Sequence, residues 1–113
     1  MAEPRRNTRV AKTAKTKPMD EYGHLQPQAP ELEEAVLGAL MIEKDAYSLV
    51  SEILRPESFY EHRHQLIYAA ITDLAIQQKP IDILTVTEQL RSRGDLEEAG
   101  GPFYITPLSG KVA

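Results

Sequence analysis

The sequence predicts an all-α protein, a compact orthogonal bundle of about five short helices. Three observations predict this class. Apolar residues recur at helical spacing in several segments, alternating strand patterns are weak throughout, and proline or glycine residues separate the periodic segments. The chain has 113 residues, of which 42% are hydrophobic, so it has the size of one small domain.

The segment 59–78 is predicted to contain the central helix. Past Tyr60 it has no Gly or Pro, and its apolar residues fall at i, i+3, i+4, i+7 and i+8. These residues are Ile67, Ala70, Ile71, Leu74 and Ala75, flanked by Leu66, Tyr68 and Ile76. Because so apolar a helix must be covered, other elements are expected to wrap around it. We expect it to run from Glu61 to Gln78 or Lys79, since Pro80 disfavours continuation.

A first helix is predicted to begin at Pro30, because proline suits the first helical position. Its first turn carries Glu31, Glu33 and Glu34, which favour the positive end of the helix dipole. The expected inner face is Leu32, Ala35, Val36, Ala39 and Leu40, extended by Leu37 and Met41. Gly38 in mid-helix costs ~1 kcal/mol relative to Ala, which indicates close approach of another backbone. The helix is expected to end near Glu43 or Lys44.

A second helix, 46–54, is predicted to follow an Asp45 cap and to stop before Pro56. Its expected buried residues are Leu49, Val50, Ile53 and Leu54. Residues 55–60 then predict a tight turn that places Phe59 in the core.

The fourth helix, 83–93, is predicted after an extended link, 80–82, in which Asp82 is the N-cap candidate. Its expected inner face is Ile83, Val86 and Leu90, with a contribution from Leu84. Arg91 and Arg93 favour its C-terminal end, and Gly94 is typical of the residue after a helix.

Residues 95–99 are expected to form one further turn before Gly100-Gly101. Phe103, Tyr104, Ile105 and Leu108 then suggest a fifth helix, which is expected to kink or break at Pro107.

Charge divides the chain into two parts. Residues 1–17 carry six basic side chains against Glu3 alone, a net charge of +5, whereas residues 18–113 carry 7 basic and 16 acidic side chains, a net charge of −9. We expect residues 1–29 to be a disordered basic leader, either a solvated tail or an arm that touches DNA. The acidic body is a poor surface for duplex DNA, because nucleic-acid affinity comes mainly from neutralising phosphates.

No catalytic, cofactor or metal site is predicted. There is no cysteine, which excludes disulfides and thiolate metal sites, and no apolar run reaches the ~20 residues of a membrane helix. Gly110-Lys111 is not a phosphate-binding loop, since Ile105 and Val112 occupy positions that need Gly and Ser or Thr. His62 and His64 face different sides of a helix. The latter is expected to be a partly buried, hydrogen-bonded residue.

The acidic residues lie in polar runs that are expected to be exposed, where nothing would raise their pKa toward catalytic use. They are Glu31, Glu33, Glu34, Glu97 and Glu98.

Two aromatic pairs are candidates for core and surface positions. In each pair one ring is expected to point inward, and Phe59 and Phe103 are assigned to the core. Tyr60 and Tyr104 are candidates for a partner interface, because tyrosine is enriched at interfaces.

Four sequence blocks in this order resemble the N-terminal domain of the bacterial replicative DNA helicase, the DnaB family. The blocks are Glu33–Ile42, Ile53–Ile71, Lys79–Leu90 and Gly94–Gly101, and the resemblance extends over about Gln28 to Ala113. The matching positions are Val36, Leu37, Gly38 and Leu40 in the first helix, Phe59, His64 and Ile67 in the turn and central helix, and Asp82 and Gly101 at the cap and double-glycine turn. These matches are structural, and Pro107 departs from the family pattern.

The resemblance implies a helicase head domain at 30–108, with 109–113 as the start of a truncated helical hairpin. Such domains form dimers and, as a trimer of dimers, a collar that stabilises the helicase hexamer and helps recruit primase. A helicase loader and single-stranded DNA are further implied partners, the latter through a motor domain that uses ATP and magnesium. The chain is therefore expected to be inactive alone, and the implied location is cytoplasmic and nucleoid-associated, without membrane contact.

Two alternatives remain open. The helicase-interacting domain of a primase has a similar helical architecture, and a small helical protein could bind nucleic acid through the basic arm. An independent enzyme is a distant third.

Overall fold

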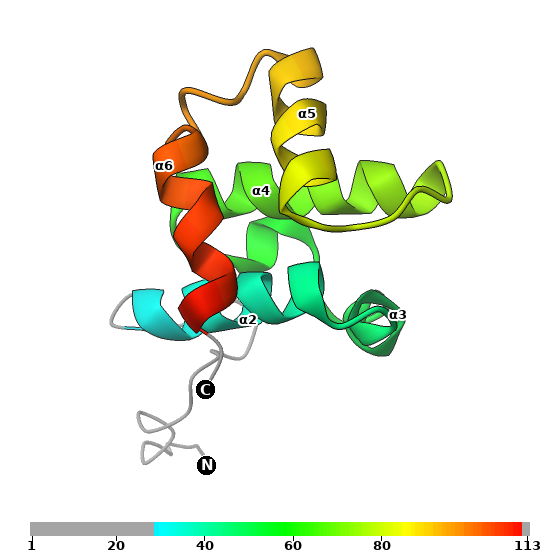
Figure 1. Cartoon of the computed structure of the whole chain (residues 1–113). Helices are drawn as coiled ribbons and strands as arrows, with labels where there is room; N and C mark the ends of the chain where they lie inside the picture. Colours follow the sequence, from blue (N-terminus) through cyan, green and yellow to red (C-terminus); the bar gives the residue numbers. More distant parts are fainter. Residues whose placement is uncertain (1–28, 112–113) are drawn as a thin grey trace, which may run out of the picture.

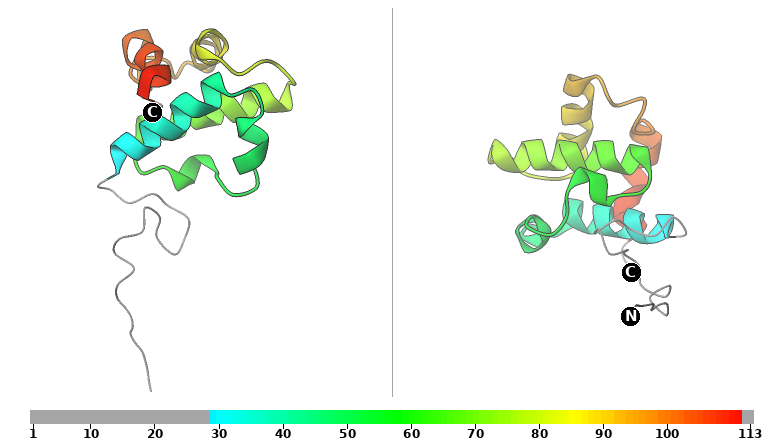
Figure 2. Two further views of the ribbon diagram at one scale, coloured as in Figure 1. Left: turned by 60° about the horizontal axis from the view of Figure 1, so that its bottom comes forward. Right: turned by 180° about the vertical axis from the view of Figure 1, so that it is seen from behind.

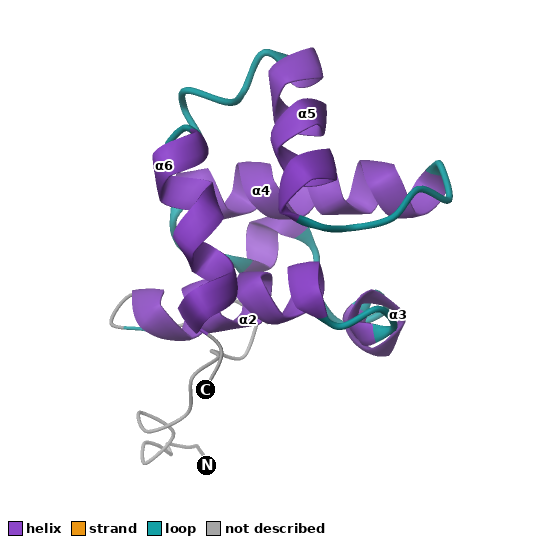
Figure 3. Cartoon of the chain, in the orientation of Figure 1, coloured by secondary structure: helices purple, strands orange, loops and turns teal. Residues whose placement is uncertain are grey.

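The computed structural model describes residues 29–111, and within that range it contains helices and no strand (Figure 3). This confirms the predicted all-α class. The elements are α2 (Pro30–Ile42), α3 (Ala46–Val50), η2 (Pro56–Ser58), α4 (His62–Ile76), α5 (Ile83–Arg93), α6 (Pro102–Ile105) and η3 (Thr106–Lys111), where η marks a 3₁₀ helix. Residues 1–28 of the predicted basic leader, and residues 112–113, lie outside the described range.

The central position predicted for α4 is confirmed. It lies between α2 and α5, and the continuous run of α6 and η3 crosses one side of the molecule to reach α2 (Figures 1 and 2). Ile67, Ala70 and Ile71 are fully buried, as the periodicity predicted. The helix ends at Ile76, two or three residues earlier than expected. Gln78 adopts a left-handed φ of 59°, and the Lys79 amide donates to the Leu74 carbonyl at 2.9 Å.

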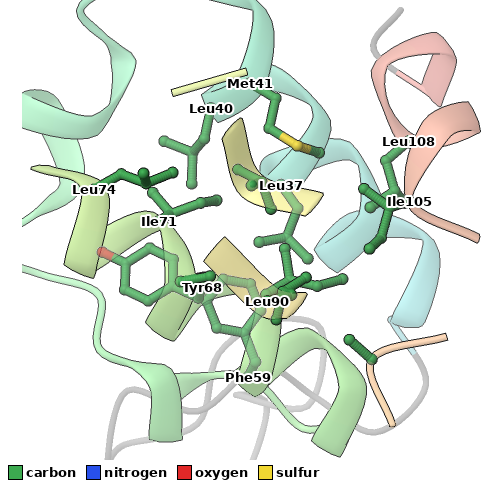
Figure 4. Close-up of a cluster of buried hydrophobic side chains, with 14 of the residues drawn as sticks. Leu37, Leu40, Met41, Phe59, Tyr68, Ile71, Leu74, Leu90, Ile105 and Leu108 are labelled. Carbon is green, nitrogen blue, oxygen red and sulfur yellow. The ribbon is translucent and has the colours of Figure 1, made fainter. Parts of the chain in front are cut away.

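The core draws apolar side chains from nearly every element, and part of it is shown in Figure 4. Its buried members are Leu37, Leu40, Met41, Leu54, Phe59, Ile67, Tyr68, Ala70, Ile71, Leu74, Val86, Leu90, Ala99, Ile105 and Leu108. Phe59 reaches it from the turn after η2, as predicted, and its ring lies 5.2 Å from that of Tyr68. Burying so many large side chains at about 1.5–3 kcal/mol each is the main favourable term in folding.

The predicted inner face of α2 is correct for Leu37, Leu40 and Met41, but the buried face is rotated away from Leu32. The buried residues are Glu33, Leu37, Gly38, Leu40 and Met41, whereas Leu32 is 39% exposed. The buried residues of α2 still have helical spacing, but the first of them is Glu33. A search for apolar periodicity does not include a charged residue. The Glu33 carboxylate turns inward because hydrogen-bond donors meet it there.

The prediction for the second helix is wrong in length and in two buried positions. The α-helix ends at Val50, and Leu49 and Ile53 are 77% and 66% exposed. Only one side of this short helix meets the core, through Ala46, Tyr47 and Val50. It sits at the end of α2, at the periphery of the bundle (Figure 1).

The prediction for α5 is confirmed at both ends. Asp82 accepts a hydrogen bond from the Thr85 amide at 2.8 Å, and the Thr85 hydroxyl accepts from the Asp82 amide at 2.9 Å. Gly94 ends the helix with a φ of 79°. Val86 and Leu90 are fully buried, but Leu84 is 70% exposed and does not join the inner face.

The C-terminal segment contains the predicted extra turn and break. The Ala99 amide donates to the Asp95 carbonyl at 2.9 Å, and Gly100 and Gly101 both have positive φ. The α-helix that starts at Pro102 becomes a 3₁₀ helix at Thr106, next to Pro107. Proline cannot continue an α-helix without clashing with the carbonyl four residues earlier.

Candidate functional site: a buried polar network and an exposed apolar surface

Glu33 and His64 form a buried pair between α2 and α4. Glu33 Oε1 lies 2.6 Å from His64 Nδ1, and both side chains are completely inaccessible to solvent. Glu33 also accepts a hydrogen bond from the Tyr60 amide at 2.6 Å and a longer one from the Glu61 amide at 3.4 Å. The start of α4 is therefore anchored on a carboxylate of α2, because an unpaired buried charge would be very costly.

Tyr104 extends this pair to α6. Its hydroxyl lies 2.5 Å from His64 Nε2 and 2.8 Å from Glu34 Oε2, while its ring stacks on His64 and lies under the Arg63 guanidinium. Burial, together with the hydrogen bond to Glu34, raises the pKa of Tyr104 well above its ordinary value. The hydroxyl is thus held inside the domain.

Glu34 closes the network at the surface side. Burial opposes its ionisation, but the hydrogen bond from Tyr104 and the charge of Lys111 outweigh burial and leave the pKa of Glu34 below its ordinary value. Lys111 Nζ lies 3.5 Å from the second Glu34 oxygen. The network therefore ties α2, α4, α6 and the end of η3 together.

Sequence reasoning missed most of this network. Glu33 and Glu34 were expected in exposed runs, and His64 was expected to be only partly buried, whereas Glu33 and His64 are fully buried. The expectation for Phe103 and Tyr104 is reversed, since Phe103 is 96% exposed and Tyr104 is half-buried. The tyrosine points inward because its hydroxyl has two hydrogen-bond partners there, the buried His64 and the partly exposed Glu34. A usable signal was the presence of His and Glu beside apolar core positions.

The matched structural positions are mostly in the core. Leu37, Leu40, Phe59 and Ile67 are buried, as are Gly38 and Gly101, while Val36 packs against the core from its edge and Asp82 caps α5. These residues fix the fold. Among residues 29–111, no group of three or more His, Asp or Glu side chains could hold a metal ion.

Large apolar side chains are exposed at several places on the surface. Leu49 and Ile53 lie on α3 and the turn after it, Phe103 lies on α6, and Tyr60 is 58% exposed before α4. Single exposed apolar side chains are common on protein surfaces, and it is contiguous apolar patches that mark surfaces contacting other proteins. In the described part of the chain, no helix is long and apolar enough to cross a bilayer.

The fold and the buried polar network define a small all-helical domain. Its buried Glu33 and His64 are hydrogen-bonded to each other, and several large apolar side chains are exposed to solvent. A protein-family model described as the DnaB-like helicase N-terminal domain matches residues 25–113, and the chain belongs to this family.

Curated relatives agree with this assignment. The chain is 52% identical over 91 residues to the replicative DNA helicase DnaB of Rhodothermus marinus, and 43% identical over 88 residues to the replicative DNA helicase DnaC of Bacillus subtilis. These alignments cover 80% and 78% of this chain but 10% and 19% of the relatives. The chain therefore spans between a tenth and a fifth of the length of the curated relatives that it matches.

A solved structure agrees as well. The crystal structure of the N-terminal domain of DnaB helicase from Mycobacterium tuberculosis superposes with a TM-score of 0.69 at 37% identity, covering 87% of this chain and 62% of that one. The resemblance to a helicase N-terminal domain is thereby confirmed. This family assignment takes the place of the alternative interpretation as a primase domain.

Proposed function

We propose that this chain is an assembly module of a replicative DNA helicase, the collar domain that stabilises the hexamer and helps recruit primase. The observation that carries the proposal is the match of nearly the whole described fold to a DnaB N-terminal domain. Its action is binding, and its place is the cytoplasm at the nucleoid. Dimers in isolation, and a hexamer built as a trimer of dimers, are the proposed assemblies.

The chemistry of unwinding is proposed to reside outside the matched region. The relatives are named replicative DNA helicases, and the matched region is at most a fifth of each of the two described above. ATP, magnesium and single-stranded DNA are therefore proposed ligands of the remaining part, and a helicase loader is a further proposed partner. The chain alone is expected to show no ATP hydrolysis above the buffer blank in a phosphate-release assay.

The exposed apolar residues are the proposed contact points. Leu49 and Ile53 project from α3 and the turn after it, and α3 has no fully buried residue. Tyr60 lies exposed beside the anchored start of α4. Large apolar and aromatic anchors dominate the energetics of protein interfaces. Tyr104 is a weaker candidate, because its hydroxyl is bonded within the domain.

Light scattering after size exclusion tests the assembly role. The chain is expected to show a mass that rises toward a dimer with concentration, and the double variant Leu49→Ser/Ile53→Ser is expected to remain monomeric. Leu84→Ser is a matched control, since Leu84 is equally exposed on α5. A strictly monomeric chain at high concentration, with no binding to the cognate primase by titration, contradicts the proposal.

A further inference from the structure

Four titratable side chains form a continuous hydrogen-bonded series, which we call the proton chain: Glu33, His64, Tyr104 and Glu34. The successive distances are 2.6 Å from Glu33 Oε1 to His64 Nδ1, 2.5 Å from His64 Nε2 to Tyr104 Oη, and 2.8 Å from Tyr104 Oη to Glu34 Oε2. The series joins α2 to α4, α4 to α6, and α6 back to α2.

The number of hydrogens in the proton chain follows from its geometry. Each of the three contacts needs one hydrogen between its two atoms, because two lone pairs at such distances repel. In their ordinary states at neutral pH, two carboxylates supply none, a neutral imidazole supplies one and a phenol supplies one. The three bonds therefore require one hydrogen more than these four groups ordinarily hold.

Glu33 does not hold the additional hydrogen. Its two oxygens accept from the amides of Tyr60 and Glu61 and from His64, so the carboxylate is surrounded by donors. The hydrogen must then lie on His64 Nε2, with Tyr104 donating to Glu34, or on Glu34, with Tyr104 donating to His64.

The surrounding charges decide between these two positions. Lys111, from η3, lies beside Glu34 and favours its ionised form, while the buried Glu33 carboxylate favours a positive charge on His64. On α4 itself, Arg63 lies over the Tyr104 ring but is paired with Glu61 at 3.0 Å, so the two largely cancel. An imidazolium donating from both nitrogens satisfies every member of the chain.

We propose that His64 carries a hydrogen on both ring nitrogens in the folded protein, so that folding takes up one proton and makes the α2–α4–α6 junction a pH-sensitive clasp. When that proton leaves, the Tyr104 hydroxyl can donate to His64 or to Glu34 but not to both. One bond that holds α6 and η3 against the rest of the domain is then lost.

The clasp predicts a direction for the pH dependence of folding. A histidine of an unfolded chain is mostly neutral above about pH 6.5. If the folded state holds one additional proton there, the folding equilibrium constant falls by up to tenfold for each unit of rising pH. This dependence ends where the folded protein also releases the proton.

The variant Tyr104→Phe isolates the clasp. It keeps the ring beneath Arg63 but removes the hydroxyl, and the remaining Glu33–His64 bond needs only a neutral imidazole. Tyr60→Phe is the matched control, because Tyr60 is exposed and its hydroxyl is not part of the proton chain. Both variants are compared with the unaltered chain.

Two measurements test the proposal. Nitrogen NMR of the histidine rings at about pH 7.5, a unit above the ordinary histidine value, is expected to show both His64 nitrogens protonated in the unaltered chain and in Tyr60→Phe, and one bare nitrogen in Tyr104→Phe. Urea unfolding at a series of pH values above about 6.5 is expected to show the proton-linked loss of stability in the first two proteins and not in the third. A bare Nε2 in the unaltered chain, or equal pH slopes in all three proteins, overturns the proposal.

Discussion

Helices α3 and α5 begin with the same sequence pattern, yet they differ in capping and in burial. Asp45-Ala-Tyr-Ser48 and Asp82-Ile-Leu-Thr85 both place Asp at the cap and a hydroxyl three residues later. In α5 the two side chains form reciprocal hydrogen bonds with the opposite backbone amides. In α3 Asp45 makes no capping bond, and the Ser48 hydroxyl donates to the Asp45 carbonyl instead.

The approach of the backbone explains this difference. Asp82 follows the extended link after Pro80 and has φ −151° and ψ −179°, the extended geometry that a capping residue needs. Asp45 follows a tight turn out of α2, in which the Ala46 amide donates to the Glu43 carbonyl, and has φ −104° and ψ 9°. The cap signal is therefore effective only where the preceding residues deliver an extended chain.

The two helices also differ in how they are held. The α5 helix buries Val86 and Leu90, and its Gln89 and Arg93 both donate to Asp73 of α4. The hydrogen bonds that the Arg93 guanidinium donates to Asp73 and Asp95 raise the pKa of Arg93. The α3 helix has no fully buried residue. We infer that α5 is part of the folding core and that α3 is a peripheral element whose side chains are available for contacts.

Truncating one leucine in each helix should give the largest contrast. Leu90→Ala is expected to destabilise the domain by about 3 kcal/mol, because Leu90 is fully buried in the core. Leu49→Ala is expected to change stability by less than about 0.5 kcal/mol, since Leu49 is mostly exposed. Urea unfolding monitored by circular dichroism measures both values. Similar losses in the two variants would place α3 in the core.

Raising the pH should reveal how α3 is attached. Burial, reinforced by neighbouring Tyr47 of α3, raises the pKa of Tyr68 from 10.0 to about 12. Its hydroxyl donates to the Leu54 carbonyl just beyond α3. A raised pKa means that the neutral form is favoured by folding, so this stability is fully present below pH 10.0 and is lost as the pH rises to about 12.

The loss should approach tenfold in the folding equilibrium constant per pH unit within that window. Tyr68→Phe is expected to be less stable at neutral pH, because the Leu54 carbonyl loses its donor, and to lose less additional stability between pH 10.0 and about 12. Absorbance of phenolate formation, followed with unfolding, reports the titration. An unchanged alkaline transition in Tyr68→Phe would assign the transition to other tyrosines, Tyr104 first.

Replacing Asp82 and Asp45 by alanine should show that only the Asp82 side chain stabilises the start of its helix. Asp82→Ala is expected to cost about 1 kcal/mol, since the Thr85 amide loses its acceptor. Asp45→Ala is expected to lower the free energy of unfolding by only a few tenths of ~1 kcal/mol, because the Asp45 side chain accepts no capping hydrogen bond. Thermal unfolding of both variants measures the difference. Equal costs would show that the Asp45 side chain caps α3 in solution.

The same comparison shows what sequence reasoning could and could not reach. Local signals were sufficient for α5, where Asp82, the 83–93 periodicity and Gly94 all agree, and for the interruption at Pro107. They were insufficient for α3 and for part of the buried face of α2, because burial there depends on contacts with elements that are distant in the sequence. Glu33 is the clearest case: its burial requires donors from Tyr60, Glu61 and His64, which are about thirty residues away. The Phe103–Tyr104 reversal has the same origin.

The smallest expected effect concerns the residues that end α4 and α5. Both helices end in one motif: the amide of Lys79 donates to the Leu74 carbonyl at 2.9 Å, and the amide of Asp95 donates to the Leu90 carbonyl at 2.9 Å. The left-handed position before each amide is Gln78, with φ 59°, in one case and Gly94, with φ 79°, in the other. Only glycine adopts this conformation without strain.

Exchanging these two residue types should therefore shift stability in opposite directions. Gln78→Gly is expected to stabilise the domain by about 0.5 kcal/mol, the relief of strain being partly offset by the greater freedom of glycine in the unfolded chain. Gly94→Gln is expected to destabilise it by about 1 kcal/mol, although no neighbouring atom obstructs a side chain there. Gln78 lies just before the extended link that leads to Asp82. If the conformation of Gln78 affects the Asp82 cap, the stability gained by Gln78→Gly should disappear when it is combined with Asp82→Ala. Simple additivity in that double variant would show that the cap of α5 is set by Pro80 and Ile81 alone.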